Sequence, residues 1–175
     1  MKKIIPSSEQ INFCKEFLKE GPIAHRGISD GDYYQQFFGL LGQVIMGDVL
    51  GVERPKNIHG FDGGYDFIFK GQKWDVKNES RDTWVYDIKK SGFKFSVYAH
   101  QIHYNCDGYI FLSHNKGEGV YQVLGWISKS DFLVQSQLIK KGTIIKRTDG
   151  SSREYKADAY VFPLKCLNRW EKFGR

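Results

Sequence analysis

The chain has 175 residues, of which 41% are hydrophobic, and it carries a formal net charge of +6. Its length suits one compact domain over residues 1–175, and no stretch approaches the roughly 18 apolar residues that span a bilayer. We therefore expect no membrane partner. Excess Lys and Arg favours polyanions, because these side chains displace the counterions of nucleic acid. A generic basic surface would explain the charge equally well.

The N-terminus and the cysteines point to a cytoplasmic protein of bacterial or phage-like kind. Residues 1–6 contain two lysines but no long apolar run follows them, so we expect no signal peptide. Three cysteines, an odd number, stand far apart at Cys14, Cys106 and Cys166. This usage fits a reducing compartment better than a disulfide framework.

Two helices are expected in the first third of the chain. The first covers about residues 9–20. The second is capped by Asp30 or Asp32, runs to about Leu50 and stops at Gly51. Because the second helix is apolar around much of its circumference, we expect it to pack against a sheet.

Mainly strands are expected after the helices, with one piece that is either extended or helical at 93–104. Ser128 with Asp131 resembles a capping box for a short helix to about residue 138, and Pro163 opens a final helix with Trp170 near its end. This order of elements predicts an α/β or α+β domain. The expected strands are 65–69, 73–78, 108–113, 121–127, 143–147 and 159–162.

The first two strands predict a hairpin that gathers charged residues. A two-residue turn at Lys70-Gly71 would place Asp66 opposite Asp75, with Cβ atoms about 4.5–5.5 Å apart. Lys77, two residues beyond Asp75, emerges on the same face. Opposed carboxylates repel unless a cation neutralises them, and carboxylate oxygens with water suit Mg²⁺. A neighbouring lysine would orient a water and stabilise charge on a phosphate.

A purely structural interpretation of this hairpin competes with the metal site. The bare string D-x₈-D-x-K is a weak signal, and Asp75 and Lys77 could simply form a salt bridge on a solvated edge. The context favours a site, because glycines precede the hairpin and an apolar helix lies upstream of it.

These residues resemble the motif of the PD-(D/E)xK superfamily of restriction-endonuclease-like nucleases. Asp66 stands at the first aspartate, with Tyr65 in place of the usual proline. Asp75-Val76-Lys77 stands as the (D/E)xK. The helical run at 42–51 is similar to the core helix of that family, and the likeness covers about residues 30–138.

The resemblance implies a mixed central sheet flanked by helices and a Mg²⁺-dependent endonuclease that hydrolyses DNA with an activated water. Asp66, Asp75 and the Val76 carbonyl would hold Mg²⁺, for which Mn²⁺ should substitute. Lys77 would position the nucleophile or neutralise the transition state. The core helix of the family often supplies a glutamate, and this chain has Gln43 there. A weaker metal site, a single ion, an engineered variant and an inactive nucleic-acid-binding relative therefore stay open.

DNA is the expected partner, and the basic residues after the motif are its expected phosphate contacts. Solvated lysines are the alternative for these residues. RNA as the substrate, a homodimer and an unrelated basic α+β protein with aromatic protein contacts also stay open. The expected contacts are Arg81, Lys89, Lys90 and Lys94.

His100, His103 and Cys106 are spaced three apart, which could bring them toward a metal on one helix face. No fourth ligand is near in sequence, so a structural role is favoured. His100 or Gln101 is also a candidate for contact with DNA or with the active site.

Overall fold

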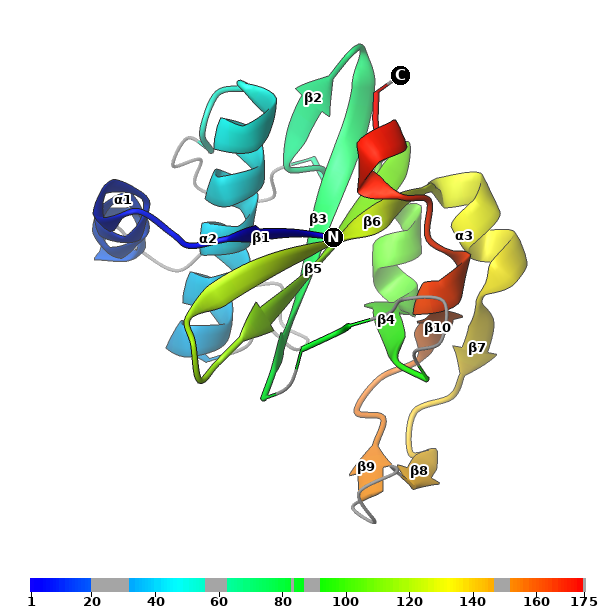
Figure 1. The fold of residues 1–175 in the computed structure, drawn as a ribbon. Helices are drawn as coiled ribbons and strands as arrows, with labels where there is room; N and C mark the ends of the chain where they lie inside the picture. Colours follow the sequence, from blue (N-terminus) through cyan, green and yellow to red (C-terminus); the bar gives the residue numbers. More distant parts are fainter. Residues whose placement is uncertain (20–31, 56–62, 83, 87–91, 147–151, 175) are drawn as a thin grey trace.

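The computed structural model describes residues 1–19, 32–55, 63–82, 84–86, 92–146 and 152–174. Over these residues it is an α+β domain (Figure 1), as the sequence predicted. The α-helices are α1 (Ser8–Lys19), α2 (Tyr33–Leu50) and α3 (Lys129–Gln135), and the 3-10 helices are η1 (Ala99–His103), η2 (Leu164–Cys166) and η3 (Trp170–Lys172). The strands are β1 (Lys2–Ile4), β2 (Phe67–Phe69), β3 (Gln72–Arg81), β4 (Lys94–Tyr98), β5 (Gly108–Asn115), β6 (Val120–Ser128), β7 (Gln137–Ile139), β8 (Ile144–Lys146), β9 (Ser152–Glu154) and β10 (Ala159–Pro163).

The central sheet has five strands in the order β1-β6-β5-β3-β2. Strands β3 and β5 are parallel and the other neighbours are antiparallel, so the sheet is mixed as expected. A second, antiparallel sheet has the order β4-β10-β7, and β8 pairs with β9 in a two-stranded arm. The arm projects from the body between the end of β7 and the start of β10 (Figure 1).

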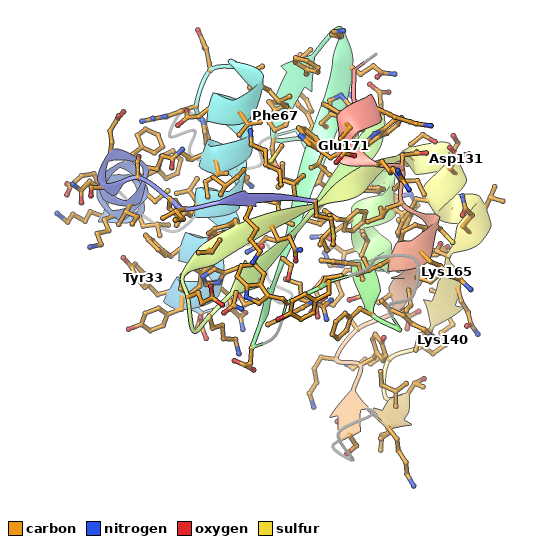
Figure 2. All side chains as sticks on the ribbon, viewed as in Figure 1. Tyr33, Phe67, Asp131, Lys140, Lys165 and Glu171 are labelled. Carbon is orange, nitrogen blue, oxygen red and sulfur yellow. The ribbon has the colours of Figure 1, made fainter. Side chains whose placement is uncertain are left out.

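The central sheet is covered on both faces. On one face α2 packs against Trp74 and Val76 of β3 and against alternate residues of β5 and β6, and α1 packs against α2. Phe67 of β2 belongs to the same cluster and lies beside α2 (Figure 2). On the other face Tyr109 and Phe111 of β5 pack against α3 and the second sheet (Figure 1). Because side chains alternate along a strand, Asp75 and Lys77 face this second layer.

Two local predictions for α2 are confirmed. The Asp32 carboxylate accepts a hydrogen bond from the Gln35 N–H at 2.8 Å and caps the helix, and Gly51 ends it with φ of 67°. Capping of this kind satisfies backbone N–H groups that the first helical turn leaves unpaired. The helix packs against the sheet, as its apolar circumference indicated.

The hairpin is also confirmed. Lys70 and Gly71 have φ of 51° and 76°, the left-handed pair that a tight two-residue hairpin needs. The predicted pairing of Phe69 with Gln72 and of Phe67 with Trp74 is present.

The predicted final helix is wrong, and the helix predicted to residue 138 is too long. Strand β10 extends through Pro163 because it pairs with β4, and η2 and η3 follow as single turns. Asn168 forms a β-bridge with Trp126 that a continuous helix would prevent. Helix α3 ends at Gln135, because the next residues join the second sheet as β7. No helix among the residues described here is long and apolar enough to cross a membrane.

Candidate functional site

A pocket of about 70 Å³ opens at the edge of the central sheet, where β2 begins. Its lining comes from α2, from the segment before β2, from β3 and from the residue after η1. All five residues expected to act in catalysis or metal binding are among those that line it. The lining residues are Gln43, Gly64, Tyr65, Asp66, Asp75, Val76, Lys77 and Tyr104.

The position of Asp66 differs from the one that the simple hairpin register predicts opposite Asp75. Strand pairing stops at Phe67, one residue short of Asp66. The Asp66 N–H donates to the Trp74 carbonyl at 2.8 Å, and its carboxylate Oδ2 accepts the Val76 N–H at 2.6 Å. The Asp66 carboxylate thus accepts the hydrogen bond from β3 that a backbone carbonyl of a neighbouring strand would otherwise accept. It therefore lies directly beside the Asp75-Val76-Lys77 segment.

Asp75 and Lys77 form an ion pair at the floor of the site. The Lys77 Nζ lies 2.8 Å from Asp75 Oδ2, and the two side chains are only 17% and 9% exposed. Burial, and secondarily the negative charge of Asp75, raise the pKa of the Cys106 thiol. Water screens such an enclosed pair weakly, so its charges act strongly on a bound anion or cation.

Gln101 is the second partner of Lys77. Its Oε1 accepts a hydrogen bond from Lys77 Nζ at 3.3 Å, and it comes from η1 in the second layer. Lysine has three N–H donors, and these two contacts use two of them. One donor therefore remains for a further acceptor in the pocket.

Gln43 reaches the same pocket from α2, on the other side of the sheet edge. Its side chain is half-buried. In the part of the chain that the structure describes, no hydrogen bond engages its amide. A half-buried amide that faces a pocket in this way has its oxygen available to a ligand.

Gly64 and Tyr104 close the outer side of the pocket. Gly64 has φ of 82°, and a Cβ there would lie 2.5 Å from the Tyr104 Cβ. The Tyr104 carbonyl accepts a hydrogen bond from Lys129 Nζ at 2.6 Å. Sequence reasoning did not identify Tyr104, because only the fold brings it to Gly64.

The two predicted phosphate contacts with described positions, Arg81 and Lys94, do not line the pocket. Arg81 donates to Glu79 at 2.7 Å and lies 4.4 Å from the centre of the Phe93 ring, with its side chain 12% exposed. Protein groups therefore enclose its guanidinium. Lys94 is exposed at the far end of β4 from η1. Lys89 and Lys90 lie outside the described residues.

The pocket offers oxygen donors of the kind that Mg²⁺ prefers: two carboxylates, an amide and a backbone carbonyl. Among the residues with described positions, no group of three or more His, Cys, Asp and Glu side chains could hold a metal. His100 stacks on Tyr98 and Cys106 is buried, which agrees with a structural role for both. The donor set thus fits a hard cation with part of its water shell.

Comparison with known proteins gives no match: no protein family, no curated protein and no solved structure is significantly similar to this chain. The residues of the pocket are therefore what indicates a function.

Proposed function

We propose that this protein is a Mg²⁺-dependent nuclease that hydrolyses the phosphodiester bonds of DNA. The observation that carries the proposal is the convergence of Asp66, Asp75, Lys77 and Gln43, from three separate segments, on one pocket. The structural interpretation accounts for the ion pair of Asp75 and Lys77. It also gives the Asp66 carboxylate a role, as acceptor of the Val76 N–H, but it does not account for the Gln43 amide, which no hydrogen bond engages within the described structure.

Asp66, Asp75, the Val76 carbonyl and Gln43 would hold the cation. When bound there, Mg²⁺ supplies Lewis acidity and lowers the pKa of a coordinated water. In the hydrolysis, a water oxygen bonds to phosphorus, one P–O ester bond breaks, and the departing oxygen takes up a proton. The remaining Lys77 N–H donates to a phosphate oxygen and offsets its growing negative charge. Gln101 fixes the Lys77 ammonium, so that less reorganisation is needed as charge develops.

The test is cleavage of supercoiled plasmid in MgCl₂, with EDTA as the metal-free condition. The parent protein should nick the plasmid only with metal, and Asp66→Asn and Asp75→Asn should each lose on the order of a hundredfold or more in rate. Asp82→Asn is the matched control, since it makes the same change on a side chain that is 81% exposed. Melting curves accompany the assay, because Asp75→Asn leaves the enclosed Lys77 without its counterion. Full activity in both site variants would remove the pocket from the reaction.

A nucleic-acid-binding protein without cleavage is the second candidate, favoured by the neutral Gln43 at the core-helix position. It predicts a salt-dependent mobility shift with DNA and no nicking in Mg²⁺ or Mn²⁺. Parallel assays with RNA of the same sequence would decide which nucleic acid is the substrate.

A further inference from the structure

The two-stranded arm of β8 and β9 is exposed over the whole of β8. Ile144 is 68% exposed and Ile145 is 36% exposed, and the alternation along a strand puts these two side chains on opposite faces of the arm. A two-stranded ribbon on its own is marginally stable in water. Exposed isoleucines on both faces therefore indicate that the arm contacts a partner.

The base of the arm is fixed to the body. The Gly142 N–H donates to the Tyr155 carbonyl at 2.8 Å, and the Tyr155 N–H donates to Thr143 at 3.0 Å. Tyr155 is buried with Ala159 and Val161 of β10. The arm is thus held at a defined place by the second sheet. Lys140 lies at its base (Figure 2).

Most of the excess positive charge of the chain falls in this arm. The described residues 140–146 and 152–156 contain five Lys and Arg against one acidic residue, a net +4 compared with +6 for the whole chain. Lys140 pairs with Asp158 and Lys156 with Glu154, while Lys141 and Lys146 form no ion pair within the described structure. Clustered charge of this kind draws a polyanion.

The arm is connected to the pocket through η1. Asp158 accepts the Lys141 N–H at 2.8 Å through its carboxylate, and its carbonyl accepts the Ala99 N–H at 2.8 Å. Ala99 begins η1, and Gln101 of the same short helix contacts Lys77 in the pocket. The base of the arm and the pocket therefore both contact the same short helix.

We propose that the arm, here the described residues 140–146 and 152–156 with strands β8 and β9, binds duplex DNA. A two-stranded ribbon fits the major groove, where Lys141 and Lys146 contact phosphates and Ile144 packs on the groove wall. Binding by the arm directs the duplex along η1 toward the pocket, and this part of the proposal rests on the proposed function. The partner of the arm is nucleic acid rather than protein, because the arm carries a net positive charge.

The test measures binding separately from cutting. Fluorescence anisotropy with a short labelled duplex in EDTA gives affinity across a salt titration for the full chain. The Lys141→Gln/Lys146→Gln variant should flatten the slope of log K against log salt by about 1.8 and weaken binding on the order of tenfold at physiological salt. Ile144→Ser should weaken binding without changing the slope.

The matched control is Lys15→Gln/Lys172→Gln, which removes the same charge from exposed positions in α1 and η3. It should leave the slope unchanged. Equal effects of the two double variants would overturn the arm proposal, as would a parent protein that does not bind duplex DNA. If the parent binds and the arm variant does not, but neither cuts plasmid in Mg²⁺, the arm proposal holds and the nuclease proposal fails.

Discussion

Gln43 presents a neutral oxygen to a pocket that already contains the charges of Asp66, Asp75 and Lys77. A glutamate at this position would add a third carboxylate. Without metal it would repel its neighbours, and with metal it would be an additional charged ligand.

Gln43→Glu should therefore lower the melting temperature without metal and raise it on Mg²⁺ addition more than in the parent protein. At a metal concentration one hundred times the Kd, bound metal stabilises by about 2.7 kcal/mol. Melting temperature and plasmid cleavage across a Mg²⁺ titration measure both effects. Gln35→Glu is the control, because it makes the same change on α2 at an exposed position. Identical metal dependence in the Gln43 variant and the parent would place Gln43 outside the metal site.

A second residue of interest is His114, which lies buried on the α2 side of the sheet. Its Nδ1 is 3.1 Å from Ser80 Oγ, and its ring stacks on Tyr121 at 4.8 Å between ring centroids. Burial, and then the charge of Lys116, lower the pKa of His114 below its ordinary value of 6.5. The folded protein therefore keeps this ring neutral where the unfolded chain binds a proton.

Stability should consequently fall with acidification. The contribution of His114 is fully present above pH 6.5 and is lost as the pH falls from there toward the folded pKa, at no more than about 1.4 kcal/mol per pH unit. Urea denaturation on either side of pH 6.5 measures the loss. His114→Gln should lower the free energy of unfolding at neutral pH but show a flatter pH dependence in this range. If the free energy of unfolding falls equally with pH in the parent and in His114→Gln, groups other than His114 cause the loss of stability.

At the scale of elements, the sequence predicted α1, α2 and the β2–β3 hairpin because each carries a local signal. Asp32 and Gly51 mark the ends of α2, and Lys70-Gly71 permits only a tight turn. The second sheet was only partly predicted. Strand β4 falls in the piece expected to be either extended or helical, and β7 was placed at the end of a predicted helix. Both strands pair with β10, which is distant in the sequence, so local patterns could not decide their conformation.

The residues and contacts of the candidate site divide in the same way, into those that the sequence predicts and those that depend on packing between distant segments. Asp66, Asp75 and Lys77 follow from counting along the hairpin, and Gln43 follows from the resemblance of its helix to the core helix of the PD-(D/E)xK superfamily. The Val76 N–H to Asp66 contact and the position of Tyr104 could not be predicted, because they depend on where β2 begins and on how η1 packs.

The glycine pair before β2 allows a direct test of how strongly the packing of Tyr104 determines the geometry of the pocket. Gly63 and Gly64 have nearly equal φ of 81° and 82°, but only a Cβ at Gly64 would meet Tyr104, at 2.5 Å. Alanine at either position costs about 1–2 kcal/mol for left-handed backbone. Gly64→Ala adds an overpacking cost of about 1–3 kcal/mol, because Tyr104 has to move.

The expected result is that Gly63→Ala stays active and is mildly destabilised, whereas Gly64→Ala is less stable and loses cleavage. Chemical denaturation and plasmid nicking of the two variants provide the comparison. Equal losses in both would mean that Tyr104 adapts and that the outer wall of the pocket is not rigid.

At the scale of the whole molecule, the charge of +6 predicts strong salt dependence of DNA cleavage. With DNA below saturation, the logarithm of the cleavage rate should fall linearly with the logarithm of salt, by about 0.9 for each phosphate contact. Lys89→Gln/Lys90→Gln should flatten this slope if those lysines contact the backbone. A slope equal to that of the parent would remove both lysines from the interface.

The two edges of the central sheet are short. Strands β1 and β2 each have three residues, and Lys2 and Lys3 lie on β1 while Lys70 directly follows β2. Short, lysine-bearing edges offer few unpaired backbone groups in a row and repel a second copy of the same edge. The protein should therefore resist edge-to-edge aggregation at high concentration, even though the strands inside the sheet are strongly apolar.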